Sequence, residues 1–211
     1  MPVKTFPVPP LDANCTIVSS GTECLVVDPG FGSHGVIAKI TKDNLKLKYI
    51  VCTHSHFDHA GDLWTLKNQF PEAQIVIGEQ ERELHANMHT QPSSFGMPAG
   101  QPQPAADLWV KDEDTLSVGD LTIQIIHSPG HSPGSICLYI PSESTLIAGD
   151  VMFRGACGRT DLFNVGSGEH LKQSIRRLLK LPASTTVITG HGSSTSIAQE
   201  SRSFKSYEHY I

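Results

Sequence analysis

Residues 53–61 read Thr53-His54-Ser55-His56-Phe57-Asp58-His59-Ala60-Gly61, with three histidines and one aspartate inside six positions. His54 and His56 stand two apart in chain that we expect to be extended, so both imidazoles point the same way and can reach one ion. Asp58 and His59 follow as the chain turns, and they aim at a neighbouring point. These donors suit zinc, iron(II) or manganese(II). The alternative is a polar, histidine-rich turn that binds no metal.

The segments on either side predict where this stretch lies in the fold. Residues 47–52 are rich in β-branched and aromatic side chains, which predicts a buried strand. Residues 62–70 carry Leu63, Leu66 and Phe70 at helical spacing, which predicts a short amphipathic helix. The histidines therefore lie where a strand ends and a helix begins, which is the usual place for a site in an α/β sheet.

The rest of the chain repeats one pattern twice, with paired strands first and then helix and strand. This pattern predicts one domain over residues 1–211, built of two βα layers with the helices outside. The strands are expected at 4–8, 15–19, 24–28, 74–78, 115–118, 121–126, 135–140, 145–148 and 185–189, and the helices at 36–44, 79–86, 168–181 and 194–207.

Residues 88–107 are rich in proline and glycine, which predicts that they form no regular element. A long irregular segment in a compact domain is often functional, so we predict a flexible flap over or beside the site at residues 88–104. The alternative is a mobile surface insertion without a catalytic role. His85 and His89 stand four apart and could in principle bind a metal from a helix, but we expect them to be surface histidines rather than ligands.

Composition excludes several classes of protein. The chain of 211 residues has a net charge of −5 and no basic run, so we expect no nucleic-acid partner and no anionic membrane partner. Its five cysteines are scattered and include no Cys-x-x-Cys pair, which predicts reduced thiols. No apolar run approaches the roughly 20 residues of a membrane span, and the N-terminal stretch has no apolar signal-like core. We expect a cytoplasmic protein.

Three more potential ligands stand at the ends of later predicted strands: His131, Asp150 and His191. Each of them alone could be a turn, cap or loop residue. Together with the first stretch they would require four coincidences of residue type and position, so we expect all of them to meet at one site. Asp28 ends the third predicted strand and is a candidate for orienting a histidine by a hydrogen bond.

These residues together resemble the metallo-β-lactamase superfamily, in which His-x-His-x-Asp-His is followed by a later histidine, an aspartate and a final histidine. The resemblance implies a four-layer αββα sandwich. It also implies two divalent metal ions per chain, with zinc expected first and iron or manganese as alternatives. His54, His56 and His131 would hold one ion, Asp58, His59 and His191 the other, Asp150 would bridge them, and Asp28 would orient a ligand.

Within the superfamily, the chain is most similar to the short glyoxalase II-like (hydroxyacylglutathione hydrolase-like) enzymes. The similarity rests on residues 128–134 (Ser-Pro-Gly-His-Ser-Pro-Gly), 158–162 (Gly-Arg-Thr-Asp-Leu) and 189–195 (Thr-Gly-His-Gly-Ser-Ser-Thr). The chain ends 20 residues after His191, so we expect it to lack the C-terminal helical domain of long glyoxalase II. The resemblance implies hydrolysis of S-D-lactoylglutathione or related acyl thioesters, as in methylglyoxal detoxification, by a metal-bridging hydroxide, with Asp58 and Asp150 as catalytic residues.

Two other functions remain open at this point. The Gly-Arg-Thr-Asp segment also occurs in the mononuclear iron persulfide dioxygenases of the superfamily, and a metal-binding fold without catalysis is a third possibility. Arg154 and Arg159 are candidates for binding a substrate carboxylate, although Arg159 could equally form an ion pair with Asp161. A small-molecule thioester, with glutathione-derived esters among the candidates, is the expected partner.

Overall fold

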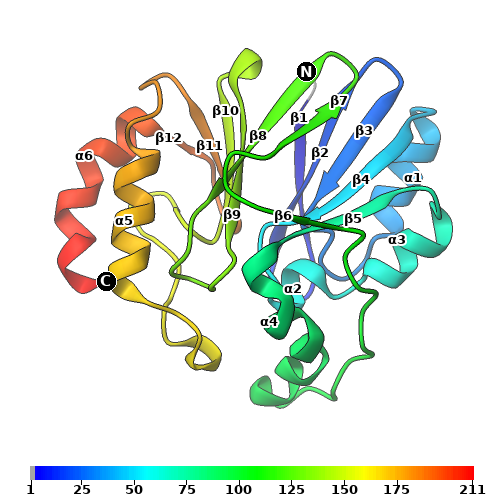
Figure 1. The fold of residues 1–211 in the computed structure, drawn as a ribbon, viewed down its shortest axis with the longest axis horizontal. Coiled ribbons are helices and arrows are strands. Elements are labelled where there is room, and N and C mark those ends of the chain that lie inside the picture. Colours follow the sequence, from blue (N-terminus) through cyan, green and yellow to red (C-terminus); the bar gives the residue numbers. More distant parts are fainter. Residues whose placement is uncertain (1–2) are drawn as a thin grey trace.

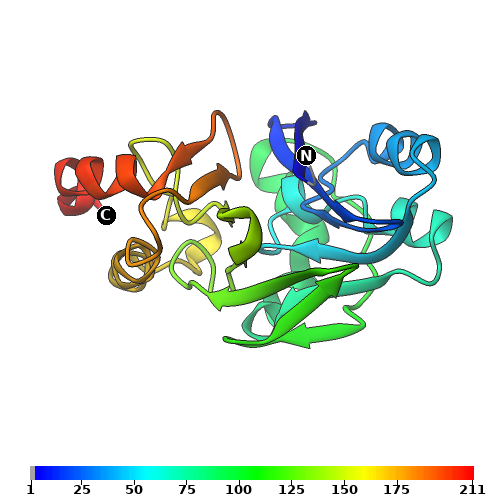
Figure 2. The ribbon, with the colours of Figure 1, turned by 90° about the horizontal axis from the view of Figure 1, so that it is seen from above.

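Two six-stranded sheets form the centre of the molecule, and helices cover their outer faces (Figure 1). The structure, a computed structural model, describes residues 3–211. Figure 2 shows the same layers from above, with α5 and α6 on one flank and α1 and α3 on the other. The four-layer αββα sandwich that the resemblance implied is thus confirmed.

The first sheet contains the strands of the N-terminal half in sequence order. β1 to β3 are antiparallel, whereas β3 to β6 run parallel to one another. Its strands are β1 (Val3–Val8), β2 (Ala13–Ser20), β3 (Glu23–Val27), β4 (Lys46–Cys52), β5 (Gln74–Gly78) and β6 (Leu108–Val110). The helices of this half are α1 (His34–Lys42), α2 (Phe57–Ala60), α3 (Leu63–Gln69) and α4 (Arg82–Asn87), with short 3-10 segments η1 (Glu79–Glu81) and η2 (Met88–Phe95).

The second sheet contains the strands of the C-terminal half in the order β12-β11-β10-β9-β8-β7, with only the β10–β11 pair parallel. These strands are β7 (Thr115–Val118), β8 (Leu121–His127), β9 (Ile136–Ile140), β10 (Thr145–Gly149), β11 (Thr186–Thr189) and β12 (Thr195–Ser196). The helices of this half are α5 (Gly168–Leu178) and α6 (Ile197–Tyr207), with 3-10 turns η3 (Pro141–Glu143), η4 (Leu162–Asn164) and η5 (Glu208–Tyr210).

Side-chain alternation explains how the layers hold together. Leu121, Ile123 and Ile125 of β8 point inward and pack in the core between the sheets, while their neighbours Thr122 and Gln124 are exposed. The inner strand β9 is buried at every position because the second sheet is covered on both faces, by the first sheet and by α5 and α6. Burial on both faces therefore accounts for its continuous apolar sequence.

One predicted segment differs from the structure. Met88–Phe95 is helical (η2) rather than irregular, so the prediction that proline and glycine forbid a regular element there is wrong for these eight residues. Met88, Gln91 and Pro92 are buried, and η2 contacts α2. These tertiary contacts stabilise the turns although Pro92 donates no backbone hydrogen bond. Residues 97–107 contain no helix or strand, as expected.

Two predictions from composition concern the state of the cysteines and the presence of a membrane span. All five cysteines are free, four of them are buried, and Cys157 is partly exposed, which agrees with the prediction of reduced thiols. Within residues 3–211, every helix is too short or too polar to cross a bilayer.

Candidate metal centre

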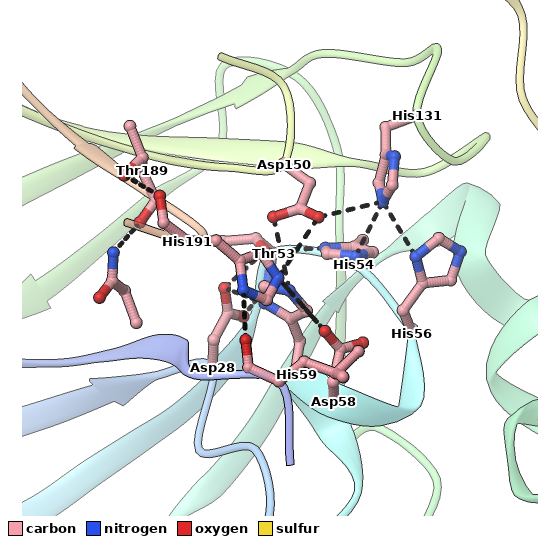
Figure 3. A network of polar contacts seen from close by, with 12 residues as sticks. Asp28, Thr53, His54, His56, Asp58, His59, His131, Asp150, Thr189 and His191 are labelled. Carbon is pink, nitrogen blue, oxygen red and sulfur yellow. Dashed lines mark hydrogen bonds and ion pairs between the residues drawn. The ribbon is translucent and has the colours of Figure 1, made fainter. Parts of the chain in front are cut away.

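The seven predicted ligands meet at one edge of the sandwich, where strands of both sheets end (Figure 3). His54 and His56 follow β4, Asp58 and His59 lie in α2, and the other three follow β8, β10 and β11: His131, Asp150 and His191. Six of these side chains are buried and His191 is partly exposed. Strand ends from both halves are needed to assemble the site, since neither sheet alone supplies all the donors.

The first cluster is made of three imidazole nitrogens. The Nε2 atom of His131 lies 3.2 Å from Nε2 of His54 and 2.9 Å from Nδ1 of His56. Tetrahedral zinc with Zn–N bonds of about 2.0–2.1 Å holds its ligand nitrogens about 3.3 Å apart. The three nitrogens therefore converge at the separation that one small divalent cation requires.

The second cluster joins Asp58, His59 and His191. The Nε2 atoms of the two histidines lie 3.2 Å apart, and Oδ2 of Asp58 lies 3.2 Å from Nε2 of His191 and 3.5 Å from Nε2 of His59. Two nitrogens and one carboxylate oxygen form a second set of convergent donors. Both ligand sets that the resemblance implied are thus present as compact groups.

Asp150 lies between the two clusters (Figure 3). Its Oδ1 is 3.4 Å from Nε2 of His59, and its Oδ2 is 3.5 Å from Nε2 of His131. Within residues 3–211, Oδ1 of Asp150 and Nε2 of His56 are both buried without a hydrogen-bond partner. A buried carboxylate oxygen without a donor is costly unless a cation compensates it, so this observation fits a bound metal.

Hydrogen bonds behind three of the histidines fix which ring nitrogen faces the centre. The Nδ1–H group of His59 donates to Asp28 at 3.0 Å, that of His131 to the carbonyl of Arg159 at 2.7 Å, and that of His191 to the carbonyl of Leu11 at 3.0 Å. In the neutral rings the Nε2 lone pairs are then free and face the centre. The rings are thus oriented as ligands before any ion binds.

Asp28 has the orienting position that the sequence suggested. It contacts His59 directly and His54 through Thr53. Oδ2 of Asp28 accepts from His59 and also from the Thr53 hydroxyl at 2.7 Å, while Oδ1 accepts from the Thr53 backbone N–H at 2.7 Å. The Thr53 hydroxyl oxygen lies 3.1 Å from Nδ1 of His54 and can accept its proton. One carboxylate therefore orients a histidine from each cluster.

Glu81 and Gln91, which the sequence analysis did not identify, hold the ligand loops from behind. The buried Glu81 carboxylate accepts from the backbone N–H of Ser55 at 2.7 Å and from that of Gly134 at 2.7 Å. The Gln91 amide accepts from the N–H of Phe57 at 3.0 Å and donates to the carbonyl of Ser55 at 3.0 Å. Glu81 thus ties together the loops that carry the first cluster, and the sequence held no signal for this role, because its burial is decided by the tertiary structure.

Burial and charge set opposite protonation states within the centre. Burial, followed by the charges of neighbouring histidines, holds the pKa of His54 well below its usual range. Burial would also lower the pKa of His59, but the three carboxylates around it outweigh burial and raise the pKa to about 10. For Asp58, burial would raise the pKa, yet His59 and His191 hold it well below the usual range. A cation that binds Nε2 of His59 must therefore displace a proton.

A cavity of about 170 Å³ opens onto the centre. Arg159 lines it, but its guanidinium is paired with Asp161 through two contacts of 2.8 Å. Arg154 is exposed and does not line this cavity, so the structure does not bring it to the centre. The cavity is lined by Leu11, His56, Phe57, Asp58, Phe95, Asp150, Arg159, Leu162, Phe163 and His191.

The structure differs from two predictions, one about the surface position of His85 and one about an irregular flap at residues 88–104. His85 is buried rather than at the surface, because its Nε2 is 2.8 Å from the carbonyl of Pro104 and its ring packs near Trp109. The predicted flap reaches the cavity through Phe95, but residues 88–95 form a helix whose Met88 and Gln91 are buried. This part of the segment lies beside the site, as predicted, but as a packed 3-10 helix, and its flexibility stays a prediction.

Comparisons with known proteins agree with this geometry. A family model described as the metallo-beta-lactamase superfamily matches residues 8–191. Hydroxyacylglutathione hydrolase GloC of Haemophilus influenzae is 34% identical over 209 residues, which cover 96% of each chain. The probable metallo-hydrolase YqgX of Bacillus subtilis is 34% identical over 198 residues, 93% of each chain. A hydroxyacylglutathione hydrolase of Vibrio cholerae is 32% identical over 186 residues, 87% of this chain and 64% of that protein.

Solved structures give the same result. The BLEG-1 B3 metallo-beta-lactamase superimposes with a TM-score of 0.86 at 33% identity, covering 95% of this chain and 96% of that one. TTHA1623, solved in a di-iron-bound form, gives a TM-score of 0.85 at 28% identity, covering 95% and 98%. ETHE1 from Myxococcus xanthus, with a TM-score of 0.79 at 23% identity over 96% and 82%, shares the fold alone. With its sandwich fold and convergent donor clusters, the chain belongs to the metallo-beta-lactamase superfamily.

Proposed function

We propose that this protein is a glyoxalase II-like hydrolase of acyl thioesters that uses two divalent metal ions, with S-D-lactoylglutathione among its substrates. The observation that carries the proposal is the pair of complete donor clusters with Asp150 between them. The similarity to hydroxyacylglutathione hydrolase GloC over 96% of both chains supports the choice of substrate class. Zinc is the metal we expect first, with iron or manganese as alternatives.

Each residue of the centre has a defined task in this proposal. His54, His56 and His131 would hold one ion, Asp58, His59 and His191 would hold the other, and Asp150 would contact both. When bound, the ions supply a water of lowered pKa and a Lewis acid for the thioester carbonyl. Asp58 and Asp150 would be the two anionic ligands, and they would offset part of the added positive charge within the buried site.

The cavity favours a thioester over an amide as substrate. Hydrolysis breaks the C–S bond, adds the oxygen of water to the acyl carbon, and yields a carboxylate, a thiol and one proton. Thiols ionise near pH ~8.5, so the sulfur can leave without being protonated by a dedicated acid. Apart from the proposed ligands, Arg159 is the one ionisable side chain that lines the cavity within residues 3–211. A guanidinium is a poor proton donor at neutral pH, so this set of residues suits a leaving group that needs no acid.

The mononuclear iron persulfide dioxygenase is the competing function. The intact second cluster of Asp58, His59 and His191 favours two ions over one.

One experiment tests the proposal against its competitor. Purified protein is loaded separately with zinc, iron(II) and manganese(II), and metal content is measured on the same samples that are assayed. We expect about two ions per chain, release of free thiol from acyl thioesters, and no oxygen uptake with glutathione persulfide. One ion per chain together with persulfide-dependent oxygen uptake would refute the hydrolase and favour the dioxygenase.

A further inference from the structure

Five of the ten residues that line the cavity at the centre are apolar. Leu11, Phe95, Leu162 and Phe163 line it together with the buried Phe57. Leu11 and Phe95 are 48% and 46% exposed, and they are two of the four large hydrophobic side chains exposed within residues 3–211. Exposed apolar side chains that gather at one cavity mark a place where an apolar ligand group is buried.

We call the apolar lining residues Leu11, Phe57, Phe95, Leu162 and Phe163 the apolar wall of the cavity. Within this wall, Phe163 has an unfavourable backbone conformation. Its φ is 54° and its ψ is 14°, in the left-handed region that a bulky side chain rarely adopts. Its ring packs edge-on against His56, with 5.2 Å between centroids, and lies 6.2 Å from the ring of Phe95. Such conformations persist where the surrounding structure enforces them, and they cluster at ligand-binding sites. The conformation places an aromatic ring at the entrance to the first cluster.

Charge and size indicate which part of a thioester this wall can receive. Glutathione carries two carboxylates and an ammonium group. Apart from the proposed metal ligands, Arg159 is the one cationic side chain that lines the cavity among the described residues, and it is already paired with Asp161. The cavity of about 170 Å³ is also smaller than the roughly 300–1,000 Å³ of pockets that enclose a whole drug-sized ligand. The wall therefore suits a small apolar group and not the charged tripeptide.

We propose that this cavity is an acyl-binding subsite that selects thioesters with an apolar acyl group. The proposal rests on the thioester hydrolysis proposed above and narrows its substrate class. The carbonyl carbon lies toward Asp150 and the histidines, the apolar acyl chain packs against Phe95 and Phe163, and the thiol part extends out of the cavity mouth. Leu11 and Leu162 complete the apolar surround.

Two esters of the same thiol test the proposal directly. S-lactoylglutathione and S-isobutyrylglutathione differ only in a hydroxyl that is replaced by a methyl group of similar size. The kcat/KM of metal-loaded protein for each ester is divided by the rate constant of its uncatalysed hydrolysis by hydroxide, which cancels intrinsic reactivity. We expect a normalised preference for the isobutyryl ester on the order of tenfold, because its added methyl group is buried.

Variants test whether the apolar wall causes the preference for the isobutyryl ester. Phe95→Ala and Phe163→Asn should each reduce the preference to less than about threefold, mainly by slowing hydrolysis of the isobutyryl ester. Asparagine tolerates a positive φ, so the second variant removes the ring without straining the backbone. Trp64→Ala is the matched control, since Trp64 is 44% exposed but does not line the cavity. It should keep the preference of the parent protein.

A binding measurement separates this inference from the proposed function. By calorimetry, S-isobutylglutathione should bind more tightly than S-(2-hydroxypropyl)glutathione, and Phe95→Ala should abolish the difference. Equal normalised rates and equal Kd values for the two members of each pair would overturn the apolar subsite. Hydrolysis of neither ester, with the binding preference intact, would defeat thioester hydrolysis but keep the subsite. Loss of both the hydrolysis and the binding preference would refute both proposals.

Discussion

Replacing Asp28 by asparagine should weaken one metal ion selectively. Asp28 accepts three hydrogen bonds, two from Thr53 and one from Nδ1 of His59. Asparagine has nearly the same shape and tolerates the positive φ of 51° at this position, so the backbone can keep its path. However, its amide oxygen can replace only one of the two carboxylate oxygens, and its NH₂ group must occupy the other position.

The more favourable arrangement of the introduced amide keeps its oxygen on the Thr53 backbone N–H and places its NH₂ group against Nδ1 of His59. His59 must then accept at Nδ1 and carry its proton on Nε2, the atom that faces Asp58 and His191. Loss of an orienting partner typically costs 10–100-fold in metal affinity, or about 1.4–2.8 kcal/mol. We expect that loss for the ion of the second cluster, because His59 contacts Asp28 directly. The ion of the first cluster should change less than about threefold, because the Thr53 hydroxyl oxygen has two lone pairs and can accept from the introduced amide and from His54 at once.

Competition with a chelator measures both affinities in the Asp28→Asn protein, and NMR of the zinc-loaded protein locates the proton of His59. Asp62→Asn is a matched control, since Asp62 also accepts backbone hydrogen bonds, from Gly32 and Ser33, but within residues 3–211 it contacts no histidine of the centre. It should bind both ions normally. Parent-like affinity for both ions in Asp28→Asn, or a His59 proton that remains on Nδ1, would refute this reasoning.

Three further predictions concern the aspartate between the clusters, the buried acid behind them and the dependence on pH. Asp150→Ala removes the carboxylate that faces both clusters, so turnover should fall by more than about 100-fold while urea unfolding changes little; equal losses of activity and stability would mean that Asp150 is mainly structural. Glu81→Gln places an amide NH₂ against the N–H of Ser55 or Gly134, so urea unfolding should show a loss of about 2–3 kcal/mol, and an unchanged midpoint would contradict the role of the two hydrogen bonds. In metal-free protein the pKa of His59 is raised to about 10, above its unfolded value near ~6.5, so its stabilising contribution is complete below about pH 6.5 and is lost as pH rises toward 10. Unfolding free energy should therefore fall between about pH 7 and 8.5, and stability that rises over this range would contradict the charged state of His59.

Local sequence carried enough information to predict most elements of this protein and the side chains that cluster at the centre. The spacing of His54, His56, Asp58 and His59 indicated metal ligands, because side-chain direction in extended chain follows from backbone geometry alone. Alternation and helical periodicity located most strands and helices, since each element here buries one face or both. Asp28 was identified as an orienting group from its position at a strand end, and its bond to His59 agrees with that prediction.

Apart from Asp28, only the tertiary structure identified the groups that hold those side chains. The carbonyls that fix His131 and His191 come from Arg159 and Leu11, which are 28 and 180 residues away in the chain. A backbone carbonyl has no residue-type signature, so no sequence pattern could have identified either partner. Packing also made a helix of Met88–Phe95, contrary to its proline content, and buried His85. In each case the deciding energy comes from tertiary contacts between separate segments of the chain, which no local sequence pattern encodes.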